Sequence, residues 1–81
     1  MNIASVRALV EAKHSADALR TAEEAILEGL EPAIAVQGED EGEQLTHVMA
    51  ARWVLDHMAA TNDDVMTSIR AYTQRVRSSI S

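Results

Sequence analysis

The chain has 81 residues, and its 13 acidic side chains against 7 basic ones give a formal net charge of −6. It contains no cysteine and only three glycines, which excludes a disulfide scaffold, a thiolate metal site and a glycine-rich phosphate loop. No run of about 18 apolar residues is present, and no basic flank precedes an apolar stretch near the start. We therefore expect a cytoplasmic protein without a membrane partner.

A single all-α domain over residues 1–81 is the predicted architecture. Alanine, the best helix former, supplies 14 of the residues, and β-branched runs are almost absent. The pattern predicts a small four-helix domain: two short helices, an acidic loop with the only proline, and two longer helices. Because a core of this size contributes roughly 3 to 5 kcal/mol at most, we expect oligomerisation to complete the helical bundle.

The first two predicted helices are short and are separated by a brief interruption. The first runs from Asn2 to Lys13, with Asn2 as its N-cap. The second begins at Ser15, whose hydroxyl can accept a backbone N–H of the first turn. It is expected to end near Glu28, because Gly29 favours a helix stop and Pro32 disfavours helix in the residue before it.

Residues 32–42 form the predicted connection between the two halves of the chain. Ile34 and Val36 lie on the same side of an extended stretch, so we expect both to pack into the core. The following residues, 37–40, have the composition of a turn. An ordered loop is therefore predicted here.

The third predicted helix, about residues 40–60, is apolar on two arcs of its surface. One wide arc is expected to face the core and consists of Val48, Ala51, Val54, Leu55, Met58 and Ala59. A second stripe consists of Met49, Trp53 and Ala60 and contains the only tryptophan. Since a helix in an isolated small bundle needs one buried face, the second stripe predicts a surface for a partner.

The fourth predicted helix follows residues 61–64, and Thr61 or Asn62 is expected to cap it. Its apolar side chains repeat at spacings of three and four residues. They form a narrow seam of the coiled-coil type, made of Val65, Ile69, Tyr72, Val76 and Ile80.

The fourth helix also carries three arginines, whereas all 13 acidic residues precede it. Arg70, Arg75 and Arg77 could contact phosphate. Three cations on a chain of net charge −6 make a weak electrostatic footprint, and cations also suit the negative C-terminal end of a helix. We therefore expect no nucleic-acid partner and expect these arginines to pair with the acidic part of the protein.

Glu43 and His47 are the candidate pair for metal or acid/base chemistry, since positions i and i+4 share a helix face. The pair is incomplete as a site, because a metal needs further ligands and no second Glu-x-x-His element is present. His47 also lies on the core-facing arc, where we expect a histidine hydrogen-bonded to Glu43 or to a carbonyl group. The prediction is a structural role, with no metal and no cofactor.

Two other polar groups have a simpler explanation than a ligand or a reaction. The acidic cluster of residues 39–43 lacks the central glycine and spaced oxygen ligands of a calcium loop, and its carboxylates suit the positive N-terminal end of a helix. The hydroxyl groups of Ser5, Ser15 and Ser68 do not lie in a strand-turn-helix elbow or beside a histidine and an acid. No catalytic residue is predicted.

Three segments resemble a family of short uncharacterised bacterial proteins. They are Ala22–Pro32, with the sequence AEEAILEGLEP, Asp40–Glu43 at the start of a helix, and Arg75–Ile80, with the sequence RVRSSI. The resemblance implies a plan of two helices, a proline-containing loop and two more helices over most of the chain. It implies no activity and assigns no catalytic residue.

The predicted function is that of a small helical interaction protein without catalytic activity. It is expected to act as a homo-oligomer, for which a homodimer is the commonest form, or as the small subunit of a larger complex. The residues expected at the interface are Met49, Trp53, Ala60 and Tyr72. The alternative is a metal- or small-molecule-binding helical domain that uses Glu43 and His47.

Overall fold

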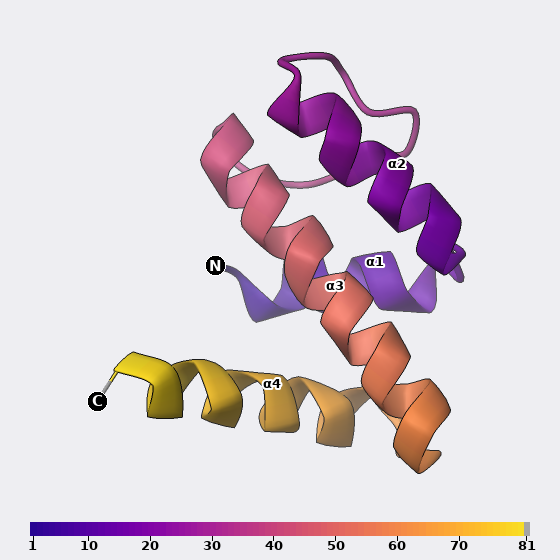
Figure 1. The fold of residues 1–81 in the computed structure, drawn as a ribbon, viewed down its shortest axis with the longest axis vertical. Helices are drawn as coiled ribbons and strands as arrows, with labels where there is room; N and C mark the ends of the chain where they lie inside the picture. Colours follow the sequence, from indigo (N-terminus) through magenta and orange to yellow (C-terminus); the bar gives the residue numbers. More distant parts are fainter. Residues whose placement is uncertain (81) are drawn as a thin grey trace.

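The computed structural model describes residues 1–80, without the side chain of Ile80, and contains four α-helices (Figure 1). They are α1 (Ile3–Glu11), α2 (Ala16–Leu27), α3 (Glu41–Thr61) and α4 (Val65–Ile80). No strand occurs in the described part of the chain. The predicted all-α fold, with two short helices, a loop and two longer helices, is confirmed. None of these helices is both long enough and apolar enough to cross a bilayer.

Helix α3 lies at the centre of the domain. Helices α1, α2 and α4 each pack against it, and α1 also contacts α4 (Figure 1). Because its neighbours approach from several directions, α3 needs apolar side chains on more than one side. Trp53 of the second apolar stripe packs against the core, so this stripe does not by itself require a partner chain.

The core is built mainly from small and β-branched side chains. Val48, Ala50, Ala51 and Val54 of α3 are fully buried. The other buried apolar residues are Val6, Leu9 and Val10 of α1, Leu19, Ala22 and Ile26 of α2, and Ile69 of α4. Among the described side chains of α4, Ile69 is the one apolar group that is buried, and the attachment of this helix depends on partly buried residues that pack against the core.

The starts of α1, α2 and α3 are each capped by a short polar side chain, and the sequence predicted two of these caps, Asn2 and Ser15. The side chains of Asn2, Ser15 and Asp40 each accept a backbone N–H from the first turn of α1, α2 and α3. Such caps satisfy donors that have no partner within the helix. The acidic residues after Asp40 lie in the first turn of α3, where the helix dipole favours them.

The cap of α4 differs from the prediction. The Oδ1 atom of Asp64 accepts the backbone N–H of Thr67 over 2.8 Å, so Asp64 is the N-cap. Thr61 is the last residue of α3, and Asn62 ends that helix in the left-handed conformation with φ 64°. Asn62 tolerates this conformation better than most residues, because its short polar side chain relieves part of the steric cost.

Helix α2 ends where Gly29 and Pro32 predict, with Glu28 as its C-cap. The N–H of Leu30 donates to the carbonyl of Ala25 over 2.8 Å, and the N–H of Gly29 donates to that of Ile26 over 3.0 Å. This pair of hydrogen bonds is the Schellman motif, which needs a left-handed residue, and Gly29 has φ 76°. The motif turns the chain sharply and leaves Leu30 at the surface.

The loop between α2 and α3 returns along the domain in an extended form. Ile34 and Val36 are partly buried and pack against the core, which confirms the prediction for both side chains. The amide of Gln44 in α3 donates to the carbonyl of Val36 over 3.4 Å and fastens the loop to the start of α3.

Candidate functional site

His47 is fully buried, and both of its ring nitrogens have backbone partners. The Nε2 atom accepts the backbone N–H of Asn2 over 2.9 Å, and Nδ1 lies 2.7 Å from the carbonyl oxygen of Gln37. Since an N–H can only donate and a carbonyl can only accept, these partners assign the neutral ring with its proton on Nδ1. His47 therefore links α1, the loop and α3. The sequence predicted Glu43 or a carbonyl group as its partner, and the structure shows a carbonyl group, that of Gln37.

Glu43 does not bond to His47. Its Oε1 atom accepts the backbone N–H of Glu39 over 3.1 Å, while Asp40 accepts the N–H of Glu43 over 2.8 Å. This reciprocal arrangement resembles a capping box at the start of α3. The two candidate ligands are thus each bonded to backbone groups, and residues 1–80 contain no cluster of three or more His, Asp or Glu side chains that could hold a metal ion.

The residues predicted at an interface fall into two groups. The ring of Trp53 stacks on His57 with centroids 4.9 Å apart, and it lies 5.5 Å from the ring of Tyr72 in α4. Trp53 and Tyr72 are therefore partly buried between α3 and α4. Met49, by contrast, is 51% exposed, and Ala60 is also exposed. An interface role for these four residues stays a prediction, but the two aromatic rings already hold α4 on α3.

The three serines considered as nucleophiles have different surroundings. Ser15 caps α2, and the hydroxyl of Ser5 donates to the side-chain oxygen of Gln37 over 3.0 Å. Ser68 is fully buried in α4, and its hydroxyl has no hydrogen-bond partner among the described residues. None of these hydroxyls is hydrogen-bonded to a histidine in the part of the chain that the structure describes.

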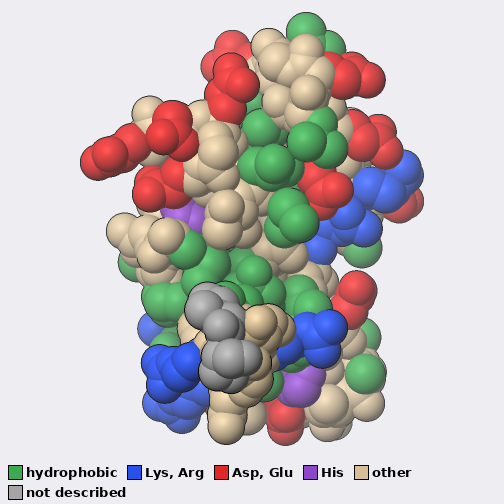
Figure 2. All heavy atoms as spheres, turned by 60° about the vertical axis from the view of Figure 1, so that its left-hand side comes forward, with side chains coloured by type: hydrophobic (Ala, Val, Ile, Leu, Met, Phe, Trp, Pro, Cys, Tyr) green, Lys and Arg blue, Asp and Glu red, His purple; other side chains and the backbone are tan. Residues whose placement is uncertain are grey.

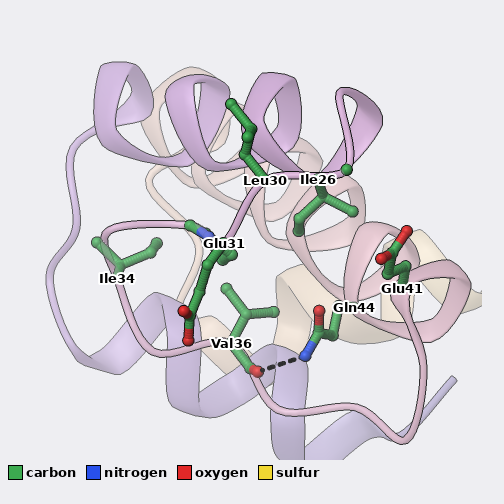
Figure 3. A pocket seen from close by; sticks show the side chains of 9 residues that line it. Ile26, Leu30, Glu31, Ile34, Val36, Glu41 and Gln44 are labelled. Carbon is green, nitrogen blue, oxygen red and sulfur yellow. Dashed lines mark hydrogen bonds between the residues drawn. The ribbon is translucent and has the colours of Figure 1, made fainter.

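The surface feature that stands out is a hollow of about 300 Å³ between the end of α2, the loop and the start of α3. Figure 3 shows the side chains that line it. They are Ile26, Leu30, Pro32, Ile34 and Val36 with the polar residues Glu31, Glu41 and Gln44, and Gly29 completes the lining. We call this feature the hollow.

The hollow is lined by apolar and acidic side chains together, and more polar than apolar surface is exposed inside it. Leu30 is 60% exposed, and Leu27, three residues before it at the end of α2, is 65% exposed. Glu31 and Glu41 are also exposed, and neither has a cationic partner among the described residues. Exposed apolar side chains next to charged groups are typical of a surface where another molecule binds.

The comparisons with known proteins place the chain in a family without assigning it a role. Residues 1–81 match a family of unknown function, DUF6952. The chain belongs to this family. The match covers the same helices and loop that carry the resemblance to an uncharacterised family, so that identification is confirmed. No curated protein and no solved structure matches the chain significantly.

The residues of the hollow were not among the sequence-predicted site residues. A signal was present in α2, where Leu27 lies outside the arc that the buried residues Leu19, Ala22 and Ile26 occupy. Leu30 follows the helix stop, so no helical periodicity applies to it. Leu27 and Leu30 are large apolar side chains near Gly29, and neither has a predicted position in the core. Together they indicated an apolar surface at this end of the domain.

Proposed function

We propose that the chain acts by binding another polypeptide at the hollow and that it catalyses no reaction. It would do so as a homo-oligomer or as the small subunit of a larger complex, in the cytoplasm of a bacterium. The observation that carries the proposal is the hollow itself, a depression of about 300 Å³ that is lined by both apolar and acidic side chains. Its carboxylates, Glu31 and Glu41, have no cationic partner among the described residues.

The exposure of the two leucines supports this proposal. Leu27 and Leu30 both keep more than half of their surface in water, although the domain is small and has few large apolar side chains. Covering such side chains stabilises a complex by roughly 25 cal/mol for each Å² of apolar surface removed from water. Leu30 lines the hollow, so it is the one of the two leucines that could anchor a partner there.

The alternative, a metal or small-molecule site at Glu43 and His47, lacks a comparable observation. His47 is buried with both ring nitrogens bonded to backbone groups, and Glu43 stabilises the start of α3. A ligand at His47 would have to replace the hydrogen bond that holds Asn2 or Gln37. The geometry therefore favours the binding of a polypeptide at the hollow.

A capture experiment tests the proposal. The chain is immobilised as the wild type and as the variants Leu30→Ser and Met49→Ser, and each is exposed to a labelled free copy and to a cell lysate. Both variants exchange an exposed apolar side chain for the same small polar one, but only Leu30 lines the hollow. We expect binding to be kept by Met49→Ser and reduced about tenfold by Leu30→Ser.

Two outcomes would overturn the proposed site. If the wild type and Leu30→Ser retain the same molecules equally, the hollow is not the binding surface. If Met49→Ser loses binding and Leu30→Ser keeps it, the partner binds the second stripe of α3 that the sequence predicted.

A further inference from the structure

The second half of α4 extends beyond the core of the domain. Its apolar seam begins on the core, where Ile69 is 2% exposed, and continues to Val76, which is 36% exposed. All residues from Gln74 to Ser79 are exposed. Figure 1 shows this end of α4 reaching past α3. We call residues 74–79 the α4 arm, and its apolar side is not fully covered by its own chain.

Two arginines flank the apolar side chain of the α4 arm. Arg75 and Arg77 lie on opposite sides of Val76, since successive residues of a helix are rotated by about 100°. Neither guanidinium has a carboxylate partner among the described residues. The α4 arm therefore presents one apolar side chain between two unpaired positive charges.

The hollow has charges of the opposite sign, since apolar side chains and the carboxylates of Glu31 and Glu41 line it together, and neither carboxylate has a cationic partner among the described residues. Helix α4 makes no contact with α2, so the α4 arm does not reach the hollow of its own chain. On the face drawn in Figure 2, most of the acidic side chains lie in the upper half, basic side chains lie at the lower end and on one side of the upper half, and hydrophobic side chains lie in the middle. The α4 arm and the hollow therefore carry charges of opposite sign, as a contact between two copies of the chain requires.

We propose that the hollow binds the α4 arm of a second copy of this chain, an inference that rests on the function proposed above. Val76 contacts the apolar side chains that line the hollow, and Arg75 and Arg77 pair with Glu31 and Glu41. A two-fold axis lets each copy supply one α4 arm and one hollow. Two equivalent contacts then close a homodimer without leaving either surface free.

A charge exchange tests this contact, with the mass of the assembly measured by sedimentation equilibrium. One variant carries Arg75→Glu and Arg77→Glu, and the other carries Glu31→Arg and Glu41→Arg. Each variant alone sets like charges against each other at both contacts, so its dissociation constant should rise at least about tenfold over the wild type. An equimolar mixture has opposite charges at both contacts again and should recover the wild-type mass.

The control variant carries Arg7→Glu and Arg20→Glu, which change the net charge by the same amount as the α4 arm variant. These exposed arginines pair only within α1 and α2, so this variant should stay a dimer. Circular dichroism checks that each variant keeps the helix content of the wild type. Where two charge-reversing substitutions lower the helix content, a variant with glutamine at the same two positions takes their place. This variant should also weaken the dimer.

Different results would overturn this inference and the function proposed above. A dimer that Leu30→Ser dissociates but that the charge exchange leaves unchanged would show that the hollow binds a different segment, which overturns the α4 arm as its occupant and keeps the proposed function. A mixture that fails to recover the wild-type mass, or a wild-type chain that stays monomeric, also overturns the inference.

Discussion

The Nε2 atom of His47 accepts a hydrogen bond from the backbone N–H of Asn2 over 2.9 Å and so ties α3 to the start of α1. Asn2 also caps α1 with its side chain. Through Nδ1, the same ring holds the carbonyl of Gln37 in the loop. One buried side chain therefore connects three segments that are far apart in the sequence.

Replacing His47 with alanine should lower the free energy of unfolding by about 1 to 3 kcal/mol, because it leaves two backbone groups without a partner and opens a small void. The metal content of the purified protein should not change. His14→Ala is the control, since His14 is only partly buried and its replacement should cost less than about 0.5 kcal/mol. Urea denaturation measures both, and equal stability of the two variants would contradict the structural role of His47.

Ser68 and Ser5 form a matched pair of buried hydroxyls. Ser68→Ala should raise the free energy of unfolding, on the order of 1 kcal/mol, because its buried hydroxyl has no partner among the described residues. Ser5→Ala should lower it by a similar amount, since the Ser5 hydroxyl donates to Gln37. Thermal denaturation compares the two, and a loss of stability in Ser68→Ala would indicate a partner for that hydroxyl.

Trp53 should be required for folding of the single chain. Trp53→Glu places a charge between the rings of His57 and Tyr72 and should cost about 3 kcal/mol or more. Met49→Glu, at an exposed position of the same stripe, should change stability by less than about 0.5 kcal/mol. Circular dichroism and denaturation separate these results. A folded but dissociated Trp53→Glu variant would instead support the interface that the sequence predicted.

The stabilisation that the Asp64 carboxylate gives to the fold should be lost in acid. Hydrogen bonds from the side chain and the backbone N–H of Thr67, with a smaller contribution from Arg70, lower the pKa of Asp64 below its ordinary value of 3.8. A carboxyl whose pKa is lower in the folded state stabilises the fold at pH values above its unfolded pKa. That stabilisation is lost as the pH falls through the lower, folded value.

Asp64→Asn keeps a capping side chain but removes this titration. The difference in urea midpoint between the wild type and Asp64→Asn should therefore be largest near neutral pH and should shrink below about pH 4. A difference that stays constant from pH 7 to pH 2.5 would contradict the assignment of Asp64 as the titrating cap.

The local features of the fold could be predicted because short-range chemistry determines them. Asn2 and Ser15 cap their helices as expected, and Gly29 ends α2 with its positive φ. The cap of α4 was assigned to the wrong residue because Thr61, Asn62, Asp63 and Asp64 are all suitable caps. Only the end of α3 decides which of them is free to begin the next helix.

The long-range features could not be predicted from periodicity. One partner of His47 is a backbone N–H 45 residues away. The pattern of side chains in the sequence does not show which backbone group a side chain will meet. For the second stripe of α3, helical spacing gives the direction of Trp53 but not the neighbour that it meets within the chain, which is Tyr72 of α4. The hollow likewise depends on how the loop returns over α2.

Sedimentation equilibrium of the wild type and of Leu30→Ser, from micromolar to millimolar concentration, tests most directly whether the chain associates through the hollow. The wild type should approach twice the 8.8 kDa mass of one chain, and Leu30→Ser should remain close to that single-chain mass over most of the range. A wild-type chain that stays at 8.8 kDa throughout, or a Leu30→Ser variant that dimerises as readily as the wild type, would contradict association at this site.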